Sequence, residues 1–537
     1  MLLLNVIRFL FTAVSVIQAN ERRQLSTTLC TSDLCKQTAR EIVSSMDENV
    51  DPCVDFYAYA CNRWNRSSGM ANEALVPKIF RQLQELFDSG NYTNPTEQKA
   101  IDIYNQCINR THEKPFDDGS LVRAIDDVLD GWSLLNDHRN VSSFRLEHTL
   151  VRLQQNDIRT FSDLTVLRNE FSINENILYF ATPSRLFGRW NLEALVNAHN
   201  KPTVRNATAQ LMNKWTPVVR RLLIAASASV QWSTIEKRLE KALTLDAMLA
   251  AGPTEAVAYR KRLTFGDLTR PPFRSRFLAN FLPLFNAMLK ASSVHFHATT
   301  ATQFGAPLQL EYLLNLDQTM AQLECDGEAG LATLADWLWW TAFYHFHLVY
   351  RGTGTCVGLV KATMPLAVSG MFLKKYIPRE AVQKAKVLTS EIANSVRDAV
   401  LLKTTWMDRA TQEAAMDRLK HTLQNVGYPE EFLENWRLID DLYAKVQVGK
   451  SLYDTLRTID QSNSWINLQK LSRTNARNDP FFPTDLTSIN AKVYPDSNYI
   501  VIPAALLQPP MFYANDLEVL NYARLGAVIG HEFTHVF

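Results

Sequence analysis

The sequence lacks any excess of charge, since 56 lysine and arginine residues stand against 55 aspartate and glutamate residues, a formal net charge of +1 at pH 7. A polyanion-binding surface needs clustered basic charge, so a nucleic-acid partner is not expected. No run of eighteen apolar residues occurs, and no stable membrane span is therefore predicted. Internal repeats and low-complexity linkers are also missing. What is present is a globular composition, 46% hydrophobic and 21% charged over 537 residues, which is too long for one core and predicts two or more domains.

The N-terminus differs from the rest. In residues 1–19 a single charge, Arg8, precedes the apolar stretch Phe9–Ile17 and the small residue Ala19. This is the build of a cleaved secretory signal peptide, and its apolar stretch is too short to span a bilayer. Ile17 is not the small residue preferred two positions before a cleavage site. The alternative is therefore an uncleaved anchor beginning at Met1, which leaves the rest of the chain outside the membrane. Either interpretation predicts an extracellular protein.

Two further features fit export. Five N-x-S/T sequons, all before residue 210, predict a glycosylated surface: Asn65, Asn91, Asn109, Asn140 and Asn206. The seven cysteines are Cys30, Cys35, Cys53, Cys61, Cys107, Cys325 and Cys356. In an oxidising compartment an odd number means a free thiol, an intermolecular bridge or a missing partner.

Helical periodicity dominates the middle of the chain. Apolar residues recur at helical spacing over 379–403, and the stretch 406–429 is rich in helix formers up to Gly427. Residues 207–250 and 331–350 also favour helix. The pattern therefore predicts a mainly α protein through this region.

The pattern changes near residue 485. Four strand-forming residues precede a proline in "NYIVIP" (498–503), which predicts a strand. Helix is expected again from about Asn515 to the end of the chain. A region of mixed α and β structure thus follows the helical region.

The final helix carries the one motif with clear chemistry. His531, Glu532 and His535 spell H-E-x-x-H, whose two histidines lie four apart on one helical face and can hold one metal ion. An accidental match in a chain of this composition has a probability of about 1%. Glu532 lies beside His535, where it can act on a water molecule. The motif supplies two zinc ligands, whereas catalytic zinc has three protein ligands.

Other residues of this helix favour a packed position. The small residues form one stripe and the large apolar residues an adjoining one: Ala523, Gly526, Ala527, Gly530 and Thr534, and Leu525, Ile529, Phe533 and Val536. A purely structural, helical scaffold would leave the histidines and the glutamate on such a helix unexplained. The sequence therefore predicts a metal site.

Several motifs together resemble one family. The stretch "SINAKVYPDSNYIVIPAALLQPPMF" (488–512) followed by "LGAVIGHEFTHVF" (525–537) is similar to the catalytic core of the neprilysin and endothelin-converting-enzyme family of zinc metallopeptidases. "CVDFYAYACNRW" (53–64) resembles the family's N-terminal cysteine motif, and "WMDRATQEAAMDRL" (406–419) and "NVGYP" (425–429) resemble its helical domain. The likeness covers essentially the whole chain after the signal peptide.

The resemblance implies a fold and a domain plan. Family members have an α+β, thermolysin-like catalytic domain into which an all-helical lid domain is inserted, and the two enclose a cavity that admits small peptides. By analogy, residues 20–75 and 446–537 belong to the catalytic domain and 76–445 to the helical domain. The chain stops at the zinc helix, so the C-terminal part of that catalytic domain is expected to be missing.

The resemblance also implies roles. His531 and His535 would bind zinc, Glu532 would be the general base, and Asn490 and Ala491 would pair with the substrate backbone. The sequence alone favours a plain loop or strand-end role for Asn490, and the resemblance reverses that preference. The family's third zinc ligand is a glutamate in an E-x-x-x-D motif beyond Phe537. This implies that the 537-residue chain binds zinc weakly, and that apolar surface on its last helix lies uncovered.

Family pairing of the cysteines implies two disulfides, Cys30–Cys35 and Cys107–Cys356. It leaves Cys53 and Cys61 without partners and assigns none to Cys325. Other positions depart from the family: Lys492 and Val493 follow Asn490–Ala491 where two aromatics are common, and Glu73–Leu75 contains no arginine to bind a substrate's free carboxylate. Dipeptide release is therefore not implied.

Two functions of different classes follow. The first is a secreted zinc metalloendopeptidase that hydrolyses small peptides and is represented by an incomplete chain. The second is an inactive, truncated homologue that binds peptides without cleaving them. The coding sequence at the 3′ end of the transcript would separate them.

Overall fold

The computed structural model describes residues 31–64, 75–90, 92–113, 118–129, 131–135, 141–168, 176–181, 201–226, 230–250, 261–306, 310–351, 355–429, 436–472, 485–495, 498–515 and 518–537. The chain divides into two compact units, each assembled from separate segments. Unit 1 comprises residues 1–100, 364–439 and 478–537, and unit 2 comprises residues 101–363 and 440–477. Compared with the expected domains, unit 1 is larger, because it includes residues 76–100 and 364–439.

Contacts within unit 1 explain its larger size. Helix α4 (Leu75–Asp88) is tied to the Gln-Pro-Pro segment, because Lys78 Nζ donates to the Pro509 carbonyl (2.9 Å) and the Gln82 and Gln508 side chains are hydrogen-bonded to each other (3.1 Å). The Ser369 hydroxyl in α15 (Pro365–Tyr376) accepts from the backbone N–H of Leu486 (3.0 Å). Helices on either side of the inserted region therefore pack with the C-terminal part of the chain.

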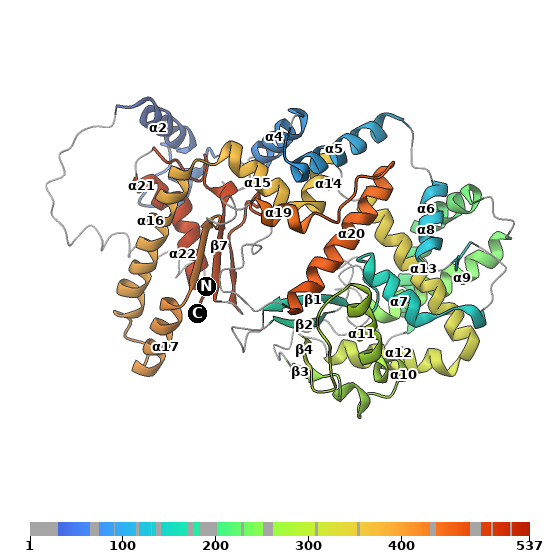
Figure 1. Ribbon diagram of the computed structural model, residues 1–537. Coiled ribbons are helices and arrows are strands. Elements are labelled where there is room, and N and C mark those ends of the chain that lie inside the picture. The colour runs from blue at the N-terminus through green and yellow to red at the C-terminus, as the bar shows by residue number, and fades with distance from the viewer. Residues whose placement is uncertain are drawn as a thin grey trace. The chain divides into compact units, whose positions relative to one another are not determined.

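Unit 1 contains a three-stranded sheet of order β5 (Leu423–Gly427), β7 (Tyr499–Pro503) and β6 (Lys492–Tyr494), in which β5 is parallel and β6 antiparallel to β7. Helices α16 (Arg379–Ser395) and α22 (Ala527–Thr534) pack beside this sheet (Figure 1). The further elements of unit 1 are α2 (Asp33–Ser45), α3 (Phe56–Cys61), π-helix η5 (Val396–Leu401), α17 (Arg409–Lys420), 3₁₀ turn η8 (Ala504–Leu506), α21 (Glu518–Asn521) and π-helix η9 (Tyr522–Gly526).

The expectation of one helix over 406–429 is wrong in its second half. Helix α17 starts at an Asp408 cap, whose side chain accepts from the Thr411 N–H (2.8 Å), and ends at Lys420. Residues Leu423–Gly427 then form strand β5 along β7. Parallel pairing with a buried strand outweighs the local helix preference of this segment.

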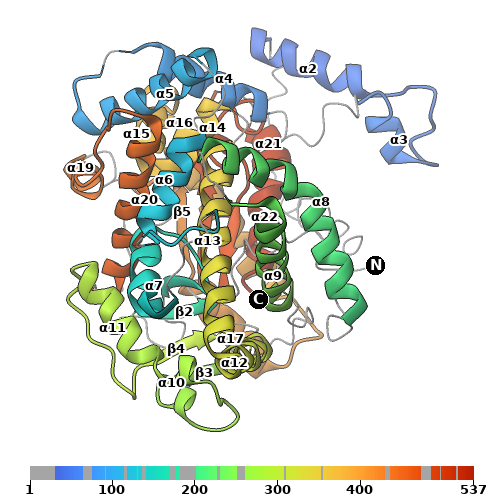
Figure 2. The ribbon, with the colours of Figure 1, turned by 90° about the vertical axis from the view of Figure 1, so that its right-hand side faces the viewer.

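Unit 2 is mainly helical and is built around α13 (Gly327–Arg351), which packs against α9, α12 and α6. Figure 2 shows α13 running between α6 and α9. Its further elements are α6 (Asp118–Val128), 3₁₀ turn η2 (Val141–Ser143), α7 (Leu146–Gln155), β1 (Asp163–Arg168), β2 (Asn176–Ala181), α8 (Lys201–Ala225), α9 (Trp232–Ala250), β3 (Lys261–Thr264), η4 (Asp267–Thr269), α10 (Arg276–Ala279), α11 (Phe281–Ala291), β4 (Gln303–Ala306), α12 (Leu310–Cys325), α14 (Cys356–Thr363), α20 (Leu452–Gln469) and η6 (Lys470–Ser472). Helices α5 (Pro95–Glu113) and α19 (Arg437–Leu442) each cross a boundary between the units.

Aromatic side chains of α13 form the centre of the unit 2 core. Trp337, Trp339, Phe343 and Phe346 are completely buried. The structure confirms the mainly α fold class and adds to the inserted region a four-stranded sheet of order β1-β2-β4-β3, which the all-helical expectation did not include. Strands β2 and β4 pair in parallel although more than a hundred residues separate them.

Within the described residues no single helix has the length and hydropathy to cross a membrane. Helices α14 and α15 pass that test only when the two are counted together as a bent pair. The expected signal peptide, residues 1–19, lies outside the described residues.

Candidate functional site

The H-E-x-x-H motif lies on α22, which follows directly from the π-helical turn η9. The large apolar residues of this segment face inward, because Leu525, Ile529 and Phe533 are 0% exposed and Val536 is 1% exposed. They pack against α16, β6 and β7. The expectation that this surface lies uncovered is therefore wrong, except at Phe537, which is 54% exposed. Burial of one whole face fixes the direction in which the opposite face points.

The two histidines of the motif lie on that opposite, exposed face. The Nε2 atoms of His531 and His535 are 3.0 Å apart, and the ring planes meet at 87°. Two nitrogens bound tetrahedrally to one zinc ion at about 2.0–2.1 Å lie about 3.3 Å apart. The observed spacing is within a few tenths of an ångström of that value, so the pair fits two positions of a zinc site.

Glu532 differs from both histidines in being buried, with 6% of its surface exposed. No residue in the described part of the chain donates a hydrogen bond to its carboxylate. Burial raises the pKa of Glu532, and the neighbouring His531 and His535 oppose that effect. A buried carboxylate without a partner is costly for stability alone, and such groups concentrate at functional sites.

Asn490 and Ala491 directly precede β6, the outermost strand of the unit 1 sheet. Ala491 is buried and Asn490 is exposed, and the backbone N–H of Asn490 donates a hydrogen bond to the Ser488 hydroxyl (3.3 Å). Among the described residues β6 pairs with β7 alone, in the register Val493 opposite Ile500. Its second edge is thus open to an extended peptide in the part of the molecule that the structure describes.

A side chain that the sequence pattern did not single out also reaches these elements. Arg418 of α17 donates through Nε to the Val536 carbonyl after α22, and through Nη2 to the Pro495 carbonyl after β6 (3.2 Å). Its position in a charged, solvent-facing helix gives no signal of these contacts. Only the fold brings the three segments together.

The described residues hold no cluster of three or more His, Cys, Asp or Glu side chains suited to a metal ion. Within them, the motif therefore contributes two histidines and the carboxylate of Glu532, and no third ligand joins the pair. The spacing of the motif is compatible with zinc, but the ligand set seen here is incomplete.

Two protein-family models match the chain. A model described as "Peptidase family M13" matches residues 52–429, and a second model of the same description matches residues 490–537. The chain belongs to peptidase family M13. The matched ranges cover most of its length and include the H-E-x-x-H helix, so the expected neprilysin-like relationship is confirmed.

Curated M13 relatives are distant but match over nearly the whole chain. Membrane metallo-endopeptidase-like 1 of Mus musculus is 24% identical, with 100% of this chain and 73% of the relative covered. Neprilysin-11 of Caenorhabditis elegans is 22% identical, with 95% of this chain but only 62% of the relative covered.

Solved structures agree on the fold. A Mycobacterium tuberculosis zinc metalloprotease in complex with an inhibitor superposes with a TM-score of 0.66 at 17% identity, covering 92% of this chain and 74% of the other. PepO of Lactobacillus rhamnosis gives 0.64 at 16% identity, covering 90% and 75%. The fold of this chain is thus the one seen in these two structures.

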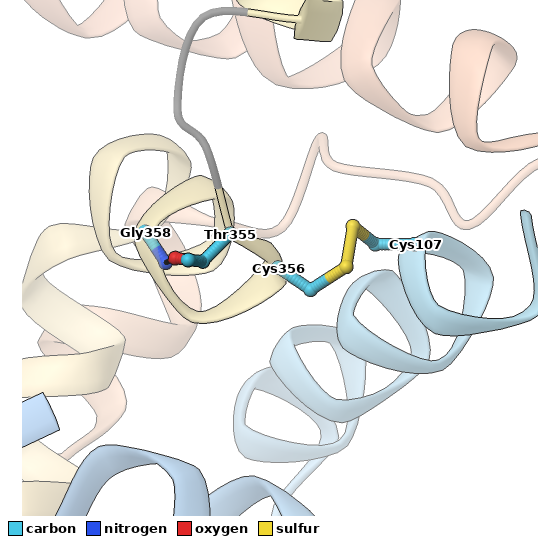
Figure 3. The surroundings of a disulfide bond; sticks show 4 residues. All are labelled: Cys107, Thr355, Cys356 and Gly358. Atoms are coloured by element: carbon cyan, nitrogen blue, oxygen red, sulfur yellow. Dashed lines mark hydrogen bonds between the residues drawn. A yellow bond between two sulfur atoms is a disulfide. The ribbon is translucent and has the colours of Figure 1, made fainter. Parts of the chain in front are cut away.

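The cysteines divide into bonded and free groups. Cys107 and Cys356 form a disulfide that joins α5 to the start of α14 (Figure 3), which is the pair implied by family resemblance. Cys35 is also disulfide-bonded, while Cys30, its expected partner, lies outside the described residues. Cys53, Cys61 and Cys325 are free and exposed.

Two of the five sequons can be placed. The side chains of Asn109 in α5 and Asn206 in α8 are exposed, so both are accessible for glycosylation. Asn65, Asn91 and Asn140 lie outside the described residues. Glycan attachment remains a prediction at all five positions.

Proposed function

We propose that this M13 family member is an extracellular zinc metalloendopeptidase that hydrolyses small peptides. The observation that carries the proposal is the grouping on α22 of two converging imidazoles and one buried, unpartnered carboxylate. A stability role explains none of the three, whereas metal-dependent hydrolysis requires all of them.

In this proposal His531 and His535 hold the zinc ion through their Nε2 atoms. Zinc bound there would polarise the scissile carbonyl and lower the pKa of water toward about 7. Glu532 takes the proton from the attacking water and delivers it to the leaving amine. Its burial supports this role, because a carboxyl held away from bulk solvent is a stronger base than an exposed one.

The substrate would lie along β6 in an extended conformation. Main-chain pairing with an open strand edge aligns a peptide without reading its sequence. Asn490 and Ala491 stand at the start of that edge, where the asparagine side chain is free to contact the substrate backbone. The domain plan proposed by family analogy assigns 20–75 and 446–537 to the catalytic domain and 76–445 to a helical lid. The compact units differ from that plan, since residues 364–439 pack with 478–537 and residues 440–477 pack with the inserted segment.

For the 537-residue chain we propose weak zinc binding and no turnover. Two imidazoles make an incomplete set, and metal affinity depends on a full set of preformed ligands. Under the M13 analogy, a glutamate C-terminal to α22 would complete it. A peptide-binding protein without peptidase activity is the second candidate, and the incomplete ligand set is the observation that favours it.

The test combines metal content and turnover. The 537-residue chain and the product encoded by the complete 3′ end of the transcript are purified, dialysed against buffer without metal, and assayed for zinc and for cleavage of a quenched fluorescent peptide. The peptidase proposal expects about one zinc per chain and cleavage in the longer product. A complete transcript that ends at Phe537, with peptide binding but no cleavage, would favour the binding protein instead.

A further inference from the structure

Arg418 links the two elements that the proposed function assigns to zinc and to substrate. Its guanidinium donates to the Val536 carbonyl at the end of the zinc helix and to the Pro495 carbonyl at the end of the open strand β6. Val536 directly follows the C-cap residue His535, and a cation near the C-terminal end of a helix is favourable. One side chain thus satisfies exposed acceptors on both elements.

The geometry requires an arginine. Nε and Nη2 lie on the same edge of the planar guanidinium, so two carbonyls held by that edge have a fixed separation. Lysine carries the same charge but is a point donor on a flexible stem, and it does not impose such a separation. Arginine at this position therefore defines the distance between the end of α22 and the end of β6.

The backbone of Arg418 is itself anchored to the connection between β6 and β7. The Asn498 side-chain amide donates to the Arg418 carbonyl (2.8 Å) and accepts from the Thr422 hydroxyl (2.9 Å). Asn498 has a positive φ of 47° and directly precedes β7, and its carbonyl accepts from the Leu423 N–H at the start of β5 (2.9 Å). The arginine therefore extends from a fixed point and not from a free helix end.

We propose that Arg418 is a positioning residue that holds the zinc helix and the substrate-aligning edge strand in register. This rests on the proposed function for the meaning of the two elements, but the mechanical link is independent of it. A small error in placing substrate relative to the reacting groups costs rate more than it costs binding. The expected signature in an active enzyme is therefore a loss of kcat at nearly constant KM.

The first experiment needs no activity. Hydrogen exchange is followed by mass spectrometry in the 537-residue chain, its Arg418→Gln variant and a matched control, Arg409→Gln. Arg409 lies on the same helix, is 91% exposed and pairs only locally with Glu413. In Arg418→Gln, amides of 533–536 and of 492–494 should both exchange at least tenfold faster than in the parent, whereas Arg409→Gln should match the parent.

Two more variants make the test specific. Arg418→Lys keeps the positive charge but lacks the two-donor edge of the guanidinium. The amide exchange rate should therefore rise by less than in Arg418→Gln and still exceed that of the parent. Asn498→Gly tolerates the positive φ while deleting both amide hydrogen bonds, and it should accelerate the same two segments. Unchanged exchange in Arg418→Gln, or acceleration confined to one segment, would overturn the link.

The second experiment addresses the reaction, using the product of the complete transcript. Arg418→Gln should lower kcat 10- to 100-fold with KM within threefold and zinc content unchanged, and Arg418→Lys should recover part of the rate. A parent that shows no turnover would refute the proposed function and leave the exchange result to decide the link. Normal kcat in Arg418→Gln together with faster exchange would show a structural contact without a role in catalysis, and would overturn the positioning proposal.

Discussion

A buried carboxylate beside a metal site, such as that of Glu532, can have two roles. It can orient a ligand, or it can accept a proton from water. Glutamine keeps the shape and one acceptor oxygen of glutamate but is not a base. The substitution Glu532→Gln therefore distinguishes the two roles without creating a cavity.

We expect Glu532→Gln to lower turnover by about 10²- to 10⁴-fold, the usual loss when a general base is removed, in the product of the complete transcript. Zinc content and peptide affinity should stay near parental values, because His531 and His535 are untouched. His535→Ala is the contrasting variant and should lose zinc and activity together. Zinc analysis beside steady-state kinetics checks both, and Glu532→Gln activity within a few-fold of the parent would remove this residue from the mechanism.

Asp126 provides a residue-scale prediction about stability. It is half-buried on α6, accepts a hydrogen bond from Trp339 Nε1 (3.1 Å), and burial raises its pKa to about 6. Its carboxyl binds a proton more readily in the folded than in the unfolded chain, so this group's contribution falls as pH rises from about 4 to about 6. A shift of about two pKa units corresponds to about 2–3 kcal/mol.

Asp126→Asn keeps an acceptor for Trp339 and removes the titration. The variant should match the parent near pH 4 and exceed it in stability by about 2–3 kcal/mol above pH 6. Urea unfolding at both pH values measures the difference between the two proteins, so that the other carboxyl groups cancel. A difference that does not change between pH 4 and pH 7 would contradict the assignment.

Strand β5 shows at the scale of one element how tertiary pairing decides conformation. The segment ends at Gly427, which is buried, has a φ of +79°, and would place a Cβ atom 3.1 Å from side-chain carbons of Leu507 and Val382. Gly131 in unit 2 has the same φ of +79° but no atom within 4 Å of the same position. Comparing alanine substitutions at the two glycines therefore distinguishes the cost of backbone strain, which both share, from the cost of steric crowding, which only Gly427 has.

We expect Gly427→Ala to destabilise the protein by about 2–4 kcal/mol, as strain and overpacking add. Gly131→Ala should cost about 1–2 kcal/mol from backbone strain alone. Chemical denaturation of both variants checks this. Equal losses would show that the packing around β5 adjusts without cost.

The elements that sequence could predict are those whose signal is local. The H-E-x-x-H spacing places two histidines on one helical face, and "NYIVIP" matches β7 within one residue. The strands of unit 2 depend on partners far along the chain, as with Leu178 and Phe304, and have no short-range signature. The same holds for the contacts of Arg418, which require α17, α22 and β6 to be folded.

The π-helical turn η9 is a second feature that sequence did not indicate. It inserts extra backbone just before α22 and changes the angular phase of the residues that follow. Gly526, its last residue, is approached closely by α16, since a Cβ there would lie 3.3 Å from Ile392 Cδ1. Periodicity alone treats 515–537 as one regular helix and misses this change of phase.

At the scale of the whole molecule, the chain crosses four times between two compact units, after residues 100, 363, 439 and 477. Such an arrangement makes each unit depend on contacts between segments that are distant in sequence, and closing those long loops is entropically expensive. In unit 2 the Cys107–Cys356 disulfide spans 249 residues and closes nearly the whole inserted segment. Its contribution should therefore be large and specific to unit 2.

The paired variant Cys107→Ser with Cys356→Ser tests this in the intact chain. Loss of a cross-link over a loop of this length removes about 5 kcal/mol in the chain-entropy description, with native-state strain and residual structure reducing the figure. Calorimetry of the double variant should show a transition displaced to lower temperature, and hydrogen exchange should assign the loss to α5, α14 and their unit 2 neighbours.

Cys325→Ser is the control, because Cys325 is a free, exposed thiol, and it should leave the transition unchanged. Variants are preferable to a reducing agent, since reduction would also open the disulfide of Cys35. If the double variant melts at the parental temperature, the long-range cross-link does not contribute to the stability of unit 2, and packing around α13 alone would account for it.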